Sequence, residues 1–68
     1  MSTMIKRWAT TAGFDKGAKV EMYKYSDGSI HYGFRDRLGR SSNLKDKAEA
    51  DKVIKIYHME MVTERKVH

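Results

Sequence analysis

The sequence contains no cysteine and no proline, and none of its apolar stretches is long. Without cysteine, neither a disulfide framework nor a thiolate metal site can form, so the fold must rest on a small hydrophobic core or on association. No segment approaches the roughly 20 apolar residues of a membrane span, and the N-terminal MSTMIKRWATTAGF lacks the apolar run of a signal peptide. We therefore expect a cytoplasmic protein that does not enter a membrane, in the host cytoplasm if it is phage-encoded.

The chain is short, with 68 residues, 40% of them hydrophobic. A chain of this length can form only one small domain, spanning residues 1–68. Fourteen lysines and arginines against nine acids give a net charge of +5. This excess favours an anionic partner without identifying it.

The dipeptide Asp27-Gly28 lies between two tyrosine-rich runs and favours a β-hairpin with a two-residue type I′ loop. In that register Tyr23 lies opposite Tyr32, and Lys24 lies opposite His31. The aromatic side is then expected to be the core, and the other side polar and basic. The expected core side is Glu21, Tyr23, Tyr25, Ile30, Tyr32 and Phe34, and the polar side is Val20, Met22, Lys24, His31, Gly33 and Arg35.

A second hairpin is predicted at Asp36 to Arg40, where Gly39 suits the left-handed position of a three-residue loop. The following short strand then has Ser42 facing Phe34 and Leu44 facing Tyr32. Its other residues, Ser41 and Asn43, extend the polar side.

From Asp46 onward the hydrophobic period becomes helical. Asp46 suits the N-cap of a helix, with Glu49 three residues later. The buried stripe is expected to be Ala50, Val53, Ile54, Tyr57 and Met61.

The predicted fold is α+β, a three-stranded antiparallel sheet packed against one C-terminal helix (β-β-β-α), with an additional N-terminal strand as an option at residues 4–11. The expected segments are an N-terminal strand and loop at 1–17, hairpins at 18–44, a helix at 45–64 and a frayed basic tail at 65–68.

Three features of residues 25–52 occur together. They are the DG hairpin followed by the alternating Ile30, Tyr32 and Phe34, the turn Arg35-Asp36-x-x-Gly39-Arg40, and Leu44 leading into a helix that contains Glu49-Ala50. In this order and spacing the segment resembles the three-stranded arm-site DNA-binding domains at the N-termini of phage-type tyrosine integrases. One departure is Asp46, which stands where that family usually has threonine.

The resemblance implies that the exposed face of the sheet enters the major groove of double-stranded DNA while the helix packs behind it. It assigns Lys24, His31, Arg35, Ser41 and Asn43 to the groove and puts Arg37 and Arg40 beside phosphates. A twisted antiparallel ribbon can enter the groove in this way, and Lys45 would add sequence-independent affinity. The charge of this segment also favours an anionic partner, with five basic residues against two acids from Arg35 to Lys47.

No catalytic site is predicted, because no Ser/His/Asp order or phosphate-binding glycine loop is present. His31 and His58 have neither cysteine nor a spaced partner histidine, so no metal site is expected. No cofactor is expected either.

The helix also has apolar residues away from its main stripe, at Ile56, Met59 and Val62. They either pack on the N-terminal strand near Ile5 and Trp8 or form a surface for a partner. In that alternative function the chain is a small phage-type adaptor or inhibitor that binds a host protein with an acidic surface, using Trp8, Ile56, Met59 and Val62. A homodimer through the helix is a further option.

Overall fold

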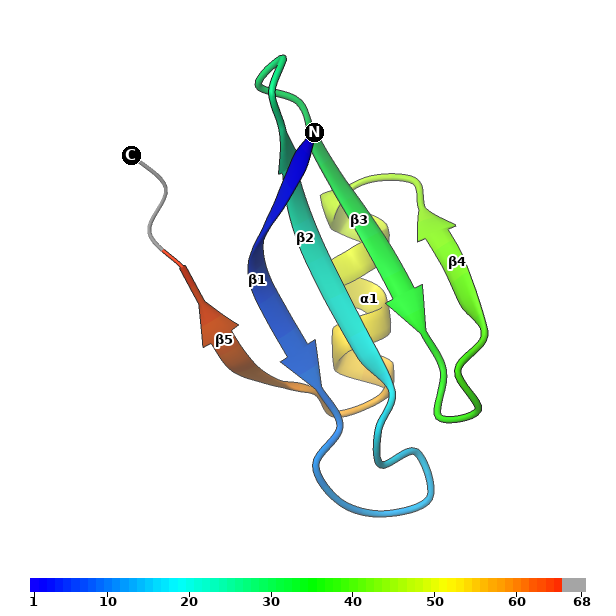
Figure 1. Cartoon of the computed structure of the whole chain (residues 1–68). Helices are drawn as coiled ribbons and strands as arrows, with labels where there is room; N and C mark the ends of the chain where they lie inside the picture. Colours follow the sequence, from blue (N-terminus) through cyan, green and yellow to red (C-terminus); the bar gives the residue numbers. More distant parts are fainter. Residues whose placement is uncertain (66–68) are drawn as a thin grey trace.

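The computed structural model describes residues 1–65, and this part of the chain forms one antiparallel sheet and one helix. Its elements are β1 (Ser2–Ala9), β2 (Lys19–Tyr25), β3 (Ile30–Arg35), β4 (Ser41–Leu44), α1 (Lys47–Ile56) and β5 (Glu60–Glu64). The strand order is β4-β3-β2-β1-β5, and α1 lies behind one face of the sheet (Figure 1). The α+β class, the antiparallel sheet and the optional N-terminal strand are confirmed. The β-β-β-α arrangement is incomplete, because a fifth strand follows the helix.

The β2–β3 hairpin has a three-residue loop in place of the predicted two-residue loop. The Tyr25 N–H donates to the Ser29 carbonyl at 2.9 Å, and the Gly28 N–H donates to the Tyr25 carbonyl at 2.9 Å. Gly28 has a φ of 88°, as expected for the left-handed residue that closes a type I turn in a hairpin. The Asp27 carboxylate also accepts the Ser29 N–H at 2.8 Å. The pairing of β2 with β3 is therefore shifted by one residue from the prediction.

This shift turns β2 over, because successive residues of a strand face opposite sides. Val20 lies opposite Phe34 and Met22 opposite Tyr32, on the side that faces α1. Val20 is 0% exposed and Tyr25 is 42% exposed. The prediction that the tyrosines of β2 lie on the core side is therefore wrong, and the apolar residues predicted for the polar side take their place.

The β3–β4 hairpin agrees with the sequence prediction. The Asp36 N–H donates to the Arg40 carbonyl at 2.9 Å, and Gly39 has a φ of 89°. Phe34 lies opposite Ser42 as expected, and Tyr32 lies opposite Leu44 in the same way. The register is correct because the glycine position fixes the loop length.

The helix begins as predicted and ends eight residues earlier than predicted. Asp46 is the N-cap, and its carboxylate accepts the Glu49 N–H at 2.9 Å. The helix ends at Ile56, where the prediction extends it to Glu64. His58 adopts a left-handed conformation with a φ of 52°, and the chain then enters β5, which pairs with β1.

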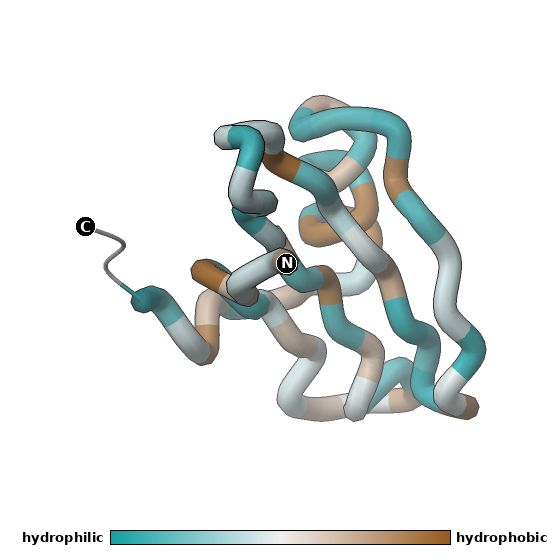
Figure 2. The backbone as a smooth tube through the Cα atoms, turned by 45° about the horizontal axis from the view of Figure 1, so that its top comes forward, coloured by the Kyte–Doolittle hydropathy of each residue, from teal (hydrophilic) through white to brown (hydrophobic). Residues whose placement is uncertain are grey.

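The core lies between α1 and the covered face of β2, β3 and β4. Its buried members are Ala18, Val20, Ala50 and Met59, with Trp8, Tyr32, Phe34, Leu44, Val53, Ile54 and Tyr57 packed around them. The helical stripe is confirmed for its members within α1 and at its C-cap, whereas Met61 lies in β5. Figure 2 shows hydrophilic and hydrophobic segments alternating along the chain with no long hydrophobic run. Within residues 1–65 no helix has the length and apolar character needed to cross a membrane.

The basic tail predicted at 65–68 falls outside the described residues except for Arg65. The Arg65 N–H donates to the Ile5 carbonyl at 2.7 Å. This residue therefore continues the contact between β5 and β1.

Candidate nucleic-acid interface

One face of the sheet is left uncovered by α1 (Figure 1). Residues directly opposite each other on neighbouring strands share a face, so the pairing of the five strands defines this surface. We call it the open face. It comprises Ser2, Met4, Arg7 and Ala9 of β1, Lys19, Glu21, Tyr23 and Tyr25 of β2, His31, Gly33 and Arg35 of β3, Ser41 and Asn43 of β4, and Glu60 and Thr63 of β5.

Four of the residues predicted to bind nucleic acid lie together on the open face, on β3 and β4. They are His31, Arg35, Ser41 and Asn43. The Arg35 Nε donates to the Ser41 hydroxyl at 3.3 Å, and Asn43 lies directly opposite Gly33. The correct register of the β3–β4 hairpin brings them together.

Lys24 does not belong to this group. It lies opposite Ile30 on β3 and Thr3 on β1, on the other side of the sheet. The prediction that Lys24 shares a face with His31 is wrong, because it depended on the two-residue hairpin loop. Lys19, which the sequence analysis did not select, takes its place on the open face, directly opposite Arg35.

Lys19 and Arg35 form a like-charge cross-strand pair. Within residues 1–65, neither makes an ion pair with an acidic side chain. Like charges directly opposite each other destabilise a sheet unless something compensates them. An anion between the two side chains would compensate them, with the Ser41 hydroxyl available at the Arg35 guanidinium.

The acid Glu21, on the same strand as Lys19, is engaged with Arg7 of β1. Its Oε2 accepts Arg7 Nε at 3.0 Å and Arg7 Nη2 at 2.7 Å, and its Oε1 accepts the Tyr23 hydroxyl at 3.1 Å. Burial alone would raise the pKa of Glu21, but the hydrogen bonds from Arg7 and Tyr23 and the charges of Arg7 and Arg35 outweigh it and lower the pKa. Glu21 is therefore a carboxylate held by Arg7.

A shallow hollow lies next to this ion pair, over β2, β3 and β4. Gly33 lies within it, where a Cβ would come no closer than 4.0 Å to Tyr23 Cε2 and the Ser42 carbonyl. Because glycine has no side chain, the surface of the open face is recessed at Gly33. The hollow is lined by Glu21, Tyr23, Gly33, Phe34, Arg35, Ser41, Ser42 and Asn43.

Two aromatic rings lie at the end of the open face next to the β2–β3 loop. The rings of Tyr25 and His31 meet edge to face, with centroids 4.5 Å apart and an interplanar angle of 65°. The His31 Nε2 is 3.1 Å from the Ser29 hydroxyl, which itself donates to Asp27 at 2.6 Å. The loop thus holds the histidine ring in place beside the tyrosine.

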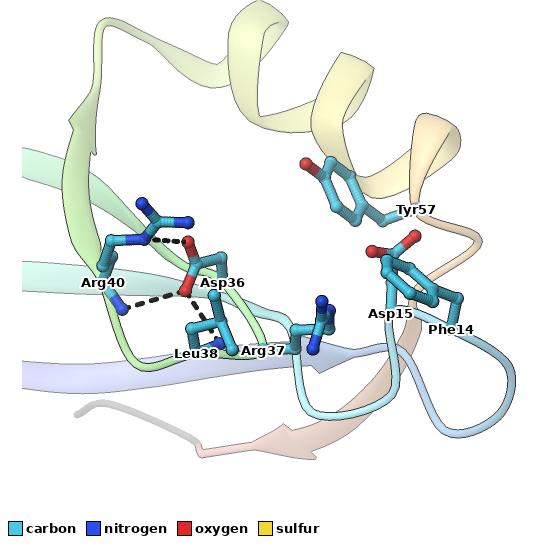
Figure 3. Close-up of a pocket in the computed structure, with 7 residues that line it drawn as sticks. All are labelled: Phe14, Asp15, Asp36, Arg37, Leu38, Arg40 and Tyr57. Carbon is cyan, nitrogen blue, oxygen red and sulfur yellow. Dashed lines mark hydrogen bonds and ion pairs between the residues drawn. The ribbon is translucent and has the colours of Figure 1, made fainter.

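The arginines of the β3–β4 turn lie at the opposite end of the sheet (Figure 3). Asp36 accepts the Arg40 backbone N–H at 2.9 Å and its Nε at 3.1 Å, and the backbone bond lowers the pKa of Asp36. Arg37 lies over the ring of Phe14, with its guanidinium carbon 4.2 Å from the ring centre. Lys45 is exposed between β4 and α1. Arg37 and Arg40 thus line a pocket together with Tyr57 at the end of α1, whereas Lys45 follows β4 at the other end of the sheet.

The residues predicted for the alternative partner surface do not form one patch. Trp8 packs against the core, and Met59 is 8% exposed and part of the core. Ile56 and Val62 are 64% and 48% exposed, respectively. The predicted helical face is wrong for Met59 and Val62, because the helix ends before both residues.

Residues that the sequence analysis missed are Lys19, Tyr23 and Tyr25. In β2, Val20 and Met22 alternate with the two tyrosines and are also apolar enough for a core position, so the hydrophobic pattern alone does not show which set is buried. Within residues 1–65 no cluster of three or more histidine, aspartate or glutamate residues is arranged to hold a metal ion.

No protein-family model, curated protein or solved structure matches this chain. The resemblance to the integrase arm-site domains therefore stays a prediction.

Proposed function

We propose that this protein binds nucleic acid through the open face of its sheet and acts as a non-enzymatic accessory or regulatory protein. The observation that carries the proposal is the like-charge pair of Lys19 and Arg35. A surface kept only for solubility has no reason to hold two cations opposite each other, whereas a phosphate would stabilise them.

The charge balance around this pair supports the proposal. Residues 30–45 carry Arg35, Arg37, Arg40 and Lys45 against the single acid Asp36. The Asp36 carboxylate is bonded within its own turn, and the Glu21 carboxylate is bonded to Arg7. Neither acid is therefore free to repel a phosphate strongly.

The side chains supply the two kinds of contact that nucleic-acid recognition uses. Lys19, Arg40 and Lys45 suit phosphates, which give affinity without reading sequence. Arg35 and Asn43 can in addition form paired hydrogen bonds with base edges. Double-stranded DNA, the ligand predicted from the sequence, is one form of nucleic acid that such contacts suit.

Fluorescence anisotropy with labelled oligonucleotides, single-stranded and duplex, at about 50 and 200 mM salt tests the proposal. We expect binding in the micromolar range or tighter, falling about tenfold or more with added salt. Arg35→Ala and Lys19→Ala are each expected to weaken it severalfold. Lys24→Ala is the matched control, because it removes the same charge from the opposite side of the sheet.

Circular dichroism will establish that each variant keeps its fold. The absence of binding to every oligonucleotide at low salt would refute the proposal. Equal weakening by Arg35→Ala and Lys24→Ala would also count against it, because attraction would then depend on net charge alone.

A second candidate function has one observation in its favour. Ile56, Met61 and Val62 remain exposed near the end of α1 and on the edge strand β5. Exposed apolar side chains on an unpaired strand edge are typical of protein partners, including the host protein of the alternative prediction. Met61→Asp would abolish such binding and leave oligonucleotide binding unchanged.

A further inference from the structure

We propose that the ligand of the open face is a single strand of nucleic acid, whose bases stack on Tyr25. This inference rests on the proposed function and specifies the class of its ligand. It departs from the sequence prediction, in which a three-stranded sheet enters the major groove of a duplex.

The first reason is that the sheet is wider than the major groove of a duplex. Neighbouring strands are about 4.8 Å apart, so five strands span about 19 Å between the outer backbones. The major groove of B-form DNA is about 12 Å wide and admits a helix or a two-stranded ribbon. Because β1 and β5 continue the open face beyond β2, the face as a whole is too wide for the groove, and only its β4 edge could enter. A single strand has no groove to enter and can lie across the surface.

The second reason is that the ring of Tyr25 is accessible from solvent. Its neighbours on the adjacent strands are Ser2 of β1 and Ser29 beside β3, both small. The ring is 42% exposed, and its aromatic contact is the edge-to-face contact with His31. An edge-to-face pair leaves ring surface uncovered, and the two serines leave space above it. A base can therefore reach the Tyr25 ring.

The chemistry of a stacking site distinguishes a single strand from a duplex. In a duplex the faces of the bases are already stacked on each other, so an exposed tyrosine finds no partner there. Unpaired bases present free ring faces, and stacking on aromatic side chains is the usual way proteins hold them. Tyr25 and His31 therefore fit a single strand of DNA or RNA, which share this chemistry.

The basic pair gives the strand its second point of attachment. His31 and Arg35 are four residues apart on β3, a distance of about 13 Å along the strand. Between them lies the hollow at Gly33, which has no side chain of its own and is flanked by Tyr23 and Asn43. A nucleic-acid chain can follow β3 from stacked bases near His31 to a phosphate between Arg35 and Lys19.

The test compares labelled oligo-dT and oligo-rU of about 12 nucleotides with a duplex of equal length, by fluorescence anisotropy at one salt concentration. Four proteins are compared: wild type, Tyr25→Ala, Tyr25→Phe and Phe14→Ala. Phe14 is the matched control, because it is an aromatic residue that is 79% exposed and lies outside the open face. Amide chemical shifts in NMR spectra will show whether residues near Tyr25 respond to the strand.

We expect the single strands to bind at least about fivefold more tightly than the duplex, and Tyr25→Ala to weaken them about tenfold. Tyr25→Phe and Phe14→Ala should stay within about twofold of wild type, because phenylalanine keeps the stacking ring and Phe14 lies elsewhere. Oligo-dU, which differs from oligo-rU only in lacking the 2′-hydroxyl, will show whether the face prefers DNA or RNA.

Tighter binding of the duplex, still dependent on Arg35, would overturn this inference and leave the proposed function standing. Unchanged single-strand affinity in Tyr25→Ala would also overturn it. Failure of every oligonucleotide to bind would remove both the inference and the proposed function.

Discussion

His58 terminates the helix in a conformation that glycine would adopt more easily, so His58→Gly is expected to stabilise the protein. The His58 N–H donates to the Lys55 carbonyl at 3.2 Å, and the Met59 N–H donates to the Ile54 carbonyl at 2.9 Å. These two bonds form the Schellman motif, in which the residue in the position of His58 is usually glycine. The motif also brings Met59 into the core beside Ile54.

The size of the effect follows from two opposing terms. A left-handed conformation costs a residue other than glycine about 1–2 kcal/mol. Glycine loses about 0.4–1 kcal/mol more than other residues when the unfolded chain becomes ordered. The difference between the two terms runs from 0 to about 1.6 kcal/mol, and its midpoint of about 0.8 kcal/mol raises the Tm of a domain of this size by about 3–6 °C.

Thermal unfolding followed by circular dichroism measures this change, and Lys55→Gly is the control. Lys55 is an exposed residue within α1, where glycine should lower the free energy of unfolding by about 1 kcal/mol. Were the helix to continue to Glu64, as the sequence alone predicts, His58 would lie in its interior and His58→Gly would also destabilise. A fall in Tm for both variants would therefore refute the observed helix end and the strand that follows it.

Three further predictions concern the open face and the start of the helix. Because the pKa of Glu21 lies below its ordinary value of 4.5 in the fold, its contribution to stability is present above that pH and is lost as pH falls through the lowered value. Acid unfolding curves of Glu21→Gln should therefore lose part of their pH dependence, and Arg7→Ala should give the same loss. Asp46→Ala should cost about 1 kcal/mol in chemical denaturation, because it removes the N-cap bond, and an unchanged midpoint would contradict this. Lys19→Glu should raise the Tm by creating an ion pair with Arg35 while weakening oligonucleotide binding, and a lower Tm would contradict the like-charge argument.

The parts of the fold that could be predicted are those where one residue has one possible role. The left-handed position of a three-residue loop favours glycine, so Gly39 fixed the β3–β4 loop and placed Ser41 and Asn43 correctly. Asp46 is followed by a clear helical period, so the start of α1 was also predictable. At both positions the local sequence is compatible with only one local structure.

The hairpin at Asp27-Gly28 could not be fixed in the same way. This dipeptide suits a two-residue loop and also the last two positions of the three-residue loop that forms. Both faces of β2 carry large apolar or aromatic residues, so the hydrophobic pattern does not choose between the registers. Tertiary packing decides between the two registers instead, because Val20 fits beneath α1 and is fully buried there.

The C-terminal strand was missed because its signals are long-range. No glycine marks the end of α1, and Met61 continues the helical stripe of Val53, Ile54 and Tyr57. The helix end is stabilised from outside, by the Thr10 hydroxyl donating to the Tyr57 carbonyl at 2.8 Å. Pairing with β1 then satisfies the backbone of β5. Contacts between residues this far apart in sequence leave no trace in a local pattern.

The residue shift in the first hairpin also changes the kind of ligand that the open face suits. The predicted register buries the tyrosines of β2 and leaves a basic ribbon, which is suited to a duplex groove. The observed register moves Lys24 away, puts Lys19 opposite Arg35 and exposes Tyr25 on the same surface. Within residues 1–65 neither Lys19 nor Arg35 forms an ion pair, and the Tyr25 ring on the same surface is 42% exposed. Together they match the phosphates and the base faces of one unpaired strand.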